Sequence, residues 1–394
     1  MTRKMRNANL PKHRDWRGNQ RRHSRADQYR SILGNGGRSA ETADLGKMLS
    51  CAILYITMGL FSFSPKGRLG IDIGTSSIKI VELAKESNRF KLSNYGAFEL
   101  DPGEDKMVSK LSNADIIGGI KQILSTTGMT ARDAVASVPS FQTFSTTITM
   151  PQLSERELAK AIPFEARKYI PVPLTEVQLD WAVVNEKDVF LVAVPKEEVN
   201  RYREIMKGAG LDLRALELEN FALIRSIVGN DLSPICILNV GGRSTSILIV
   251  ENGFQRASHD YEIGGYEITS AIARSLGVNI KRAEEMKKSL GMRNISDNII
   301  KEAVVSLINS MILEVNKTIQ NYEDVKKSKI VKIFLVGGLA NMPDILLYFS
   351  EKLGRTVSFG NPIARVVMPA GIDPLRLSLN LSFAVSIGLA MREI

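Results

Sequence analysis

Residues 69–81 read LGIDIGTSSIKIV, and this stretch decides the fold. Two apolar runs flank a small polar turn, Gly74 to Ser77, which predicts a β-hairpin. Such a turn presents backbone N–H groups and hydroxyls that can bind a phosphate. Asp72 precedes the turn, where a carboxylate can hold a hydrated metal ion, and Lys79 follows it, where an ammonium can bind phosphate. On its own, the pattern is more typical of an ordinary hairpin.

A second copy of the pattern changes that interpretation. Residues 237–250 read ILNVGGRSTSILIV, with Asn239 at the position of Asp72 and the pair Gly241-Gly242 in the turn. The two copies lie 167 residues apart (239 − 72), a separation that predicts two similar domains rather than a solenoid of short repeats. Two such turns facing each other across a cleft would clamp a polyphosphate from both sides.

A third stretch, residues 333–340, reads IFLVGGLA. It predicts a buried strand that runs into Gly337 and Gly338 and then into a helix. The N-terminus of such a helix suits the adenosine or α-phosphate end of a nucleotide.

In this order, the three stretches resemble the first phosphate loop, the second phosphate loop and the adenosine motif of the actin-like ATPase superfamily. Residues 283–287 (AEEMK) are similar to the helix of that superfamily in which Glu284 and Lys287 approach the ribose and base. Residues 219–223 (ENFAL) resemble the first interdomain helix, whose acidic residue, Glu219 here, orients the attacking water in some members.

Other segments narrow the resemblance. Residues 384–390 (AVSIGLA) are similar to the second interdomain helix, in which small residues at 384 and 388 let two helices approach closely. The segments 72–83, 150–171 and 256–265 resemble the PilM family of type IV pilus assembly proteins, which is related to FtsA. The resemblance covers roughly residues 58–394.

The resemblance implies an α/β actin-like ATPase fold, with two duplicated domains flanking a nucleotide cleft. We expect a first domain over residues 58–233 that includes an inserted α+β subdomain at about 150–212. A second domain over 234–394 is expected to carry the adenosine motif and the C-terminal interdomain helix.

The resemblance also implies ATP and Mg²⁺ as ligands. Asp72, which would hold Mg²⁺ through water, and Glu219 are expected to serve catalysis. The nucleotide-binding residues are expected to be Gly74, Thr75, Ser76, Ser77, Lys79, Asn239, Gly241, Gly242, Glu284, Lys287, Gly337 and Gly338. Many members of the superfamily have Asp at the position of Asn239, and an amide cannot carry charge toward Mg²⁺. We therefore predict that ATP binds and that hydrolysis is slow or absent.

Composition excludes several other classes of function. The net charge of the 394 residues is +10, but residues 1–57 hold 12 Lys/Arg and 4 Asp/Glu, so the rest of the chain carries only +2. With 6% aromatic residues there is also little material for base stacking, so no nucleic-acid partner is expected. Two cysteines and three histidines form no disulfide framework or metal motif, which fits a reducing, cytoplasmic setting.

The N-terminal region differs from the rest. Residues 1–57 have the composition of a disordered basic extension, and residues from Met58 onward resemble the start of a PilM-type chain. One interpretation is that the extension is untranslated sequence upstream of a misassigned start. A chain starting at Met58 is then expected to melt like the full chain. The alternative is a genuine basic tail with a membrane-surface anchor at 49–63, since that apolar run is shorter than the roughly 20 residues that span a bilayer.

The leading hypothesis is a cytoplasmic ATP-binding scaffold on the inner-membrane assembly platform of a type IV pilus or a related type II secretion system. The family resemblance implies recruitment by the N-terminal peptide of a PilN-like membrane protein, contacts with other platform proteins, and no membrane span of its own. Residues 150–173, with Leu158 and Tyr169, are expected to line the peptide groove. Alternatives are an FtsA-like division protein, a small-molecule kinase of the same superfamily, and a relative that has lost nucleotide binding.

Overall fold

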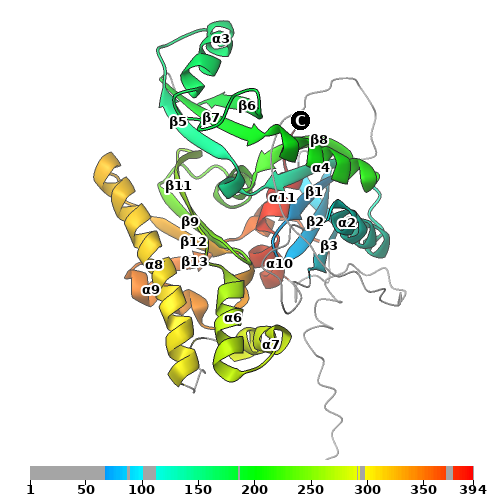
Figure 1. The fold of residues 1–394 in the computed structure, drawn as a ribbon, viewed down its shortest axis with the longest axis vertical. Coiled ribbons are helices and arrows are strands. Elements are labelled where there is room, and N and C mark those ends of the chain that lie inside the picture. The colour runs from blue at the N-terminus through cyan, green and yellow to red at the C-terminus, as the bar shows by residue number, and fades with distance from the viewer. Residues whose placement is uncertain are drawn as a thin grey trace, which may run out of the picture.

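The computed structural model describes residues 67–86, 89–100, 112–184, 187–290, 292, 298–369 and 376–393. Both hypotheses for residues 1–57, extension or anchor, concern sequence outside these ranges and stay predictions. Within them the chain forms two sheets side by side, each with helices, and a smaller subdomain at one end (Figure 1).

The first domain is built on a six-stranded sheet of order β14-β3-β2-β1-β4-β8. Its strands are β1 (Gly67–Ile73), β2 (Ser77–Glu86), β3 (Arg89–Glu99), β4 (Asp133–Val138), β8 (Asp212–Leu218) and β14 (Val366–Val367). The hairpin predicted from residues 69–81 is β1–β2, and its antiparallel register places Asp72 opposite Lys79. Two helices, α2 (Asn113–Thr127) and α4 (Lys196–Gly208), share one core with the sheet.

The second domain repeats this plan. Its sheet has the order β11-β10-β9-β12-β13, formed by β9 (Ile235–Val240), β10 (Thr245–Glu251), β11 (Phe254–Tyr261), β12 (Lys332–Val336) and β13 (Val357–Phe359). The order β3-β2-β1-β4 in the first sheet thus recurs as β11-β10-β9-β12, which confirms the duplicated fold. Its helices are α6 (Gly265–Leu276), α7 (Ile280–Leu290), α8 (Asn298–Lys326) and α9 (Ile345–Leu353).

The inserted subdomain has a three-stranded sheet of order β5-β7-β6, with β5 (Phe144–Thr149), β6 (Val177–Val183) and β7 (Asp188–Pro195). One face of the sheet packs on α3 (Glu155–Ala166), which begins with a capping box between Ser154 and Glu157. The other face joins the first domain, where the ring of Phe190 meets Phe221 edge-on at 5.3 Å. By packing, β5 belongs to the insert although it precedes the predicted range of 150–212. Helix α4 lies inside that range but packs with α2.

The C-terminal chain ties the two domains together. After η4 (Pro362–Arg365), β14 pairs with β3, and α10 (Arg376–Ser382) leads to α11 (Ala384–Ala390) between the sheets (Figure 1). Helix α11 meets α5 (Glu219–Leu223), which continues as the π-helix η2 (Ile224–Val228). A Cβ added at Gly388 would lie 2.0 Å from the carbonyl oxygen of Ala222, so the predicted close approach at residue 388 is confirmed.

Candidate functional site

The turn between β1 and β2 is closed by a hydrogen bond in which the Gly74 N–H donates to the Ser77 carbonyl at 3.0 Å. At its base, Asp72 is buried and accepts a hydrogen bond from the Ser137 hydroxyl at 3.0 Å. The ammonium of Lys79 lies 3.7 Å from the other carboxylate oxygen of Asp72. The hairpin register therefore brings a carboxylate and an ammonium together beside a turn of small residues.

The turn between β9 and β10 has the same geometry with different chemistry. The Gly241 N–H donates to the Ser244 carbonyl at 2.9 Å, as Gly74 does in the first turn. Asn239 lies opposite Ser246, so an amide and a hydroxyl stand where the first hairpin has a carboxylate and an ammonium. The Ser246 hydroxyl donates to Asp260 at 2.6 Å. Asp260, on β11, thus supplies a carboxylate that the second turn itself lacks.

The two turns face each other across the domain interface. A Cβ added at Gly242 would lie 2.8 Å from the hydroxyl oxygens of both Thr75 and Ser76. The structure therefore brings together the residues that the sequence predicted for the two phosphate loops. A side chain at 242 would require these hydroxyl groups to move, so glycine lets the two turns approach this closely.

Glu219 begins α5 and faces the same interface. Burial raises the pKa of its carboxyl to about 8, and repulsion from Asp72 and Asp260 adds to the rise, whereas Lys79 opposes it. Glu219 is therefore mostly protonated near neutral pH in the protein without ligands. A protonated carboxyl can donate a hydrogen bond to a nearby water but cannot accept a proton from it.

The third predicted motif lies beside the second turn. Gly337 has a φ of +95°, and a Cβ there would lie 2.3 Å from the Val240 carbonyl and 2.8 Å from the Asn239 side-chain oxygen. Gly338, in contrast, has open space beside it. The glycine pair therefore packs one residue against the phosphate loop and leaves the next one facing open space.

The strand, the glycine pair and the helix follow one another in the predicted order, but a 3₁₀ turn separates the pair from the α-helix. A short 3₁₀ turn, η3 (Gly338–Asn341), follows β12, and α9 begins only at Ile345. The reason lies in Pro343, because a proline disfavours helical backbone in the residue before it. Met342 is extended, with φ −70° and ψ 129°.

Glu284 and Lys287 support the second turn from behind. The buried ammonium of Lys287 donates to the Gly265 carbonyl and the Thr269 hydroxyl, both at 2.8 Å, and pairs with Glu284 at 2.6 Å. Burial alone would raise the pKa of Glu284, but its lysine neighbours outweigh burial and hold that pKa at about 2. These contacts fix α7 to the first turn of α6.

The first turn of α6 in turn holds the second phosphate loop. The N–H groups of Gly265 and Tyr266 donate to the carbonyls of Gly241 and Gly242 at 3.0 and 2.7 Å. In this structure Glu284 and Lys287 are therefore positioning residues for the loop. Their predicted contact with ribose and base stays a prediction.

Asp260 and Ser137 were missed by sequence reasoning. Asp260 lies 21 residues after Asn239 and approaches it only through the β10–β11 register, so no local motif marks it. In the part of the chain that the structure describes, no group of three or more His, Cys, Asp or Glu side chains could hold a metal ion. This is consistent with Mg²⁺ held through one carboxylate, waters and substrate phosphates.

Taken together, the duplicated sheets and paired turns define an α/β protein of the actin-like ATPase class. The chain belongs to the family described as type IV pilus assembly protein PilM, whose model matches residues 70–394. The solved PilM-PilN type IV pilus biogenesis complex is similar, with 25% identity and a TM-score of 0.72 over 82% of this chain and 98% of that one.

Two further relatives are more distant. The ethanolamine utilization protein EutJ from Carboxydothermus hydrogenoformans has 19% identity and a TM-score of 0.50, covering 83% of this chain and 90% of its own. The cell division protein FtsA of Bacillus subtilis (strain 168) is 22% identical over 194 residues, which is 44% of each chain. The chain thus matches less than half the length of that curated relative.

Proposed function

We propose that this protein binds Mg-ATP between its two domains and acts as a scaffold of a type IV pilus, or related type II secretion, assembly platform. The observation that carries the proposal is the contact between two equivalent turns, with Asp72 and Lys79 at the base of one of them. Membership of the PilM family supports the pilus role.

The residues at this interface fit a magnesium polyphosphate. Asp72 would orient a hydrated cation, Lys79 would bind a phosphate oxygen, and the hydroxyls of residues 75–77 and the amides of 241–242 would complete the cradle. Bound Mg²⁺ would neutralise the phosphates. The space beside Gly338 is open to the adenosine end of the ligand. Because both domains contribute groups, the nucleotide would set the angle between them, as a hinge-closing ligand does.

Slow or absent hydrolysis follows from the second turn. Asn239 offers an uncharged amide, and Asp260, the carboxylate opposite Ser246 on β11, already accepts a hydrogen bond from the Ser246 hydroxyl. Glu219 would orient the water, but its proton is held by burial and by its acidic neighbours. The site therefore favours retention of ATP over its turnover.

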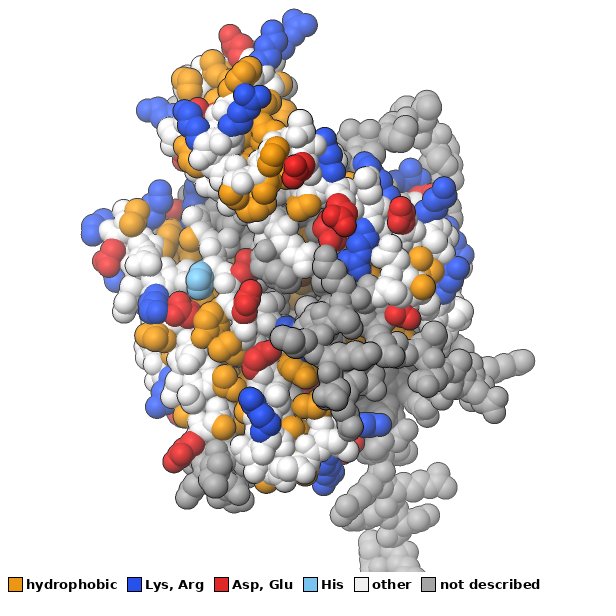
Figure 2. Space-filling view, in the orientation of Figure 1, with side chains coloured by type: hydrophobic (Ala, Val, Ile, Leu, Met, Phe, Trp, Pro, Cys, Tyr) orange, Lys and Arg blue, Asp and Glu red, His pale blue; other side chains and the backbone are white. Residues whose placement is uncertain are grey.

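A partner would bring the protein to the membrane. Among the described residues no helix combines the length and apolarity needed to cross a bilayer. The insert exposes apolar side chains, with Phe164 68% and Tyr169 49% exposed, and Figure 2 shows hydrophobic atoms gathered over this end of the molecule. We assign this surface to the N-terminal peptide of a PilN-like membrane protein, which would place the chain at the cytoplasmic face of the inner membrane.

One residue of the predicted peptide groove needs correction. Leu158 was expected to line the groove, but it is only 6% exposed and packs inside the insert with Ile162 and Ala166. Tyr169 lies beyond the end of α3 and is the better surface residue. Substitutions at Leu158 would therefore report on folding of the insert rather than on peptide binding.

The test is fluorescence anisotropy of a labelled peptide from the N-terminus of the PilN-like protein, with the full chain. Tyr169→Asp is expected to weaken peptide binding by at least about tenfold, since it replaces an apolar anchor by a charge. Val325→Asp, which places the same charge at an exposed apolar residue of the second domain, is the control, and Mg-ATP affinity should be unchanged in both variants. Full peptide affinity in a folded Tyr169→Asp variant would place the groove elsewhere.

A further inference from the structure

A second surface feature lies far from the paired turns, between β11 and α8. A groove of about 420 Å³ runs between the edge strand of the second sheet and this long helix. The strand contributes residues 256–259, and the helix contributes Glu314, Lys317, Thr318, Asn321, Tyr322, Val325 and Lys326. No residue of the proposed nucleotide site lines it.

One wall of the groove is an unpaired strand edge. β11 stands at the end of the order β11-β10-β9-β12-β13, so its outer N–H and C=O groups have no strand beside them among the described residues. Its eight residues, Phe254–Tyr261, are long enough to pair with a further strand. Unpaired edges of this kind are the surfaces to which extended peptides add.

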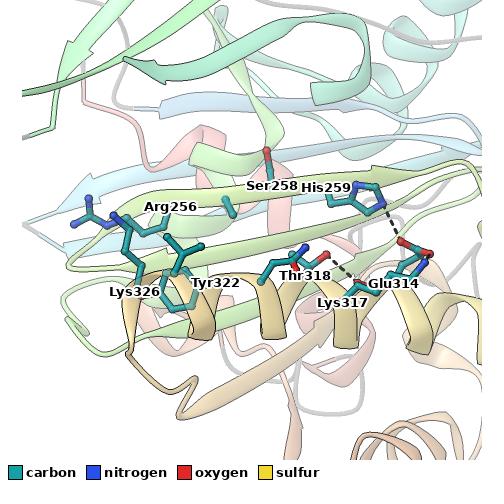
Figure 3. Close-up of a pocket in the computed structure, with 11 residues that line it drawn as sticks. Arg256, Ser258, His259, Glu314, Lys317, Thr318, Tyr322 and Lys326 are labelled. Atoms are coloured by element: carbon teal, nitrogen blue, oxygen red, sulfur yellow. Dashed lines mark hydrogen bonds and ion pairs between the residues drawn. The ribbon is translucent and has the colours of Figure 1, made fainter. Parts of the chain in front are cut away.

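The groove is polarised along its length. Figure 3 shows Arg256 and Lys326 at one end, and His259 with Glu314 at the other. At the second end the charges are balanced, because Glu314 pairs with Lys317 at 2.6 Å and with His259 at 3.5 Å. At the first end, Arg256 pairs only with Glu251, at 3.7 Å, and Lys326 has no ion-pair partner among the described residues.

The basic end also exposes apolar side chains. Val325, beside Lys326, is 77% exposed, and Phe254, at the start of β11, is 40% exposed. Because Lys326 adds a positive charge that no described carboxylate pairs with, this end favours an occupant with both apolar and acidic side chains. The basic N-terminal region, with 12 Lys/Arg against 4 Asp/Glu in residues 1–57, has the wrong charge for this end.

We propose that this groove binds an extended acidic segment of another protein, which adds to β11 as a sixth strand of the second sheet. Its carboxylates would meet Arg256 and Lys326, which Figure 3 shows at the same end of the groove. The added strand allows this, because its side chains of one parity face α8 and the others face away from it. In β11 itself, a β-bulge leaves Arg256 without an opposite residue on β10 and breaks the alternation there. In Figure 3 the side chain of Ser258 points away from the helix, while His259 points toward it.

The proposal is independent of nucleotide binding and of the surface on the insert. It assigns the second domain a separate contact, so one chain would hold two partners at once. A scaffold on an assembly platform needs such a second contact.

The probe is a labelled peptide of about eight residues that alternates Glu and Val, tested by anisotropy with the full chain. A Lys-Val peptide of the same length and a Glu-Val peptide with N-methyl groups along one edge serve as matched probes. The acidic peptide is expected to bind, and both matched probes to bind at least about tenfold more weakly, because one lacks charge complementarity and the other lacks ladder donors.

Two variants test the residues. Val325→Asp and the double change Lys326→Glu with Lys327→Glu alter only exposed side chains and are each expected to weaken binding by at least about tenfold. Lys281→Glu, an exposed change on α7, and Tyr169→Asp, on the insert, should leave it unchanged.

Several results would overturn the proposal. These are no binding of the acidic peptide, equal binding of the N-methylated peptide, or an equal loss in the Lys281→Glu control. A concentration-dependent dimer of the chain that the acidic peptide does not displace would show that a second copy covers the groove instead.

Discussion

Replacing Lys79 by Met removes the ammonium at the base of the first turn while keeping an unbranched apolar stem. The side chain of Lys79 is 17% exposed, and its nitrogen lies 3.7 Å from Asp72, which is longer than a normal hydrogen bond and leaves its donors available to a phosphate. A charge-assisted contact of this kind contributes about 1.5–3 kcal/mol. Its loss should weaken Mg-ATP binding roughly ten- to 150-fold.

The assay is titration calorimetry of the full chain with Mg-ATP, paired with thermal unfolding to show that the variant is folded. Lys85→Met is the matched control, because Lys85 lies on the same strand and its partner is the exposed Glu393. That surface pair is worth about 0–1 kcal/mol and is remote from the turns. If Lys79→Met bound Mg-ATP within about twofold of the wild type, or if Lys85→Met weakened binding equally, the assignment of Lys79 would be refuted.

Further predictions concern hydrolysis, packing and pH. Asn239→Asp should raise steady-state ATP turnover without tightening binding, and a wild-type rate near about 10 per second would contradict the account of the second turn. Gly388→Ala should lower the melting temperature, with a cost of about 1–3 kcal/mol, because its Cβ would lie 2.0 Å from the Ala222 carbonyl. Gly338→Ala, with open space around it, should not lower the melting temperature. If both alanine variants lowered the melting temperature equally, the contact between α11 and α5 would not be the cause. The pKa of Glu219 is about 8 in the folded state and roughly 4.3 in the unfolded state. Because the folded state holds the proton more tightly, this group makes the free energy of unfolding fall as pH rises between those two values. The stability gained by Glu219→Gln over wild type in ligand-free denaturant unfolding should therefore grow from pH 4 to pH 8, and a constant difference would contradict the assigned pKa.

The features that the sequence predicted well are those whose cause is local. The two hairpins follow from apolar runs around turns of small residues. The contact between the turns was predictable too, but only because the pattern occurs twice at domain-scale spacing.

Other features depend on contacts between distant residues. Asp260 approaches the site through the register of β10 and β11, and Lys287 donates a hydrogen bond to the Gly265 carbonyl. No local sequence pattern marks either contact. That α4, which lies inside the predicted range of the insert, packs with α2 of the first domain also has no local signal. The start of α9 depends on Pro343, which keeps Met342 extended between the glycine pair and the helix.

Amide hydrogen–deuterium exchange with and without Mg-ATP tests most directly whether the paired turns clamp a nucleotide. The account predicts that residues 74–77 and 241–244 become protected together, because one ligand contacts both turns, while residues 254–261 of β11 do not change. Protection of only one turn, or no protection at saturating Mg-ATP, would contradict it.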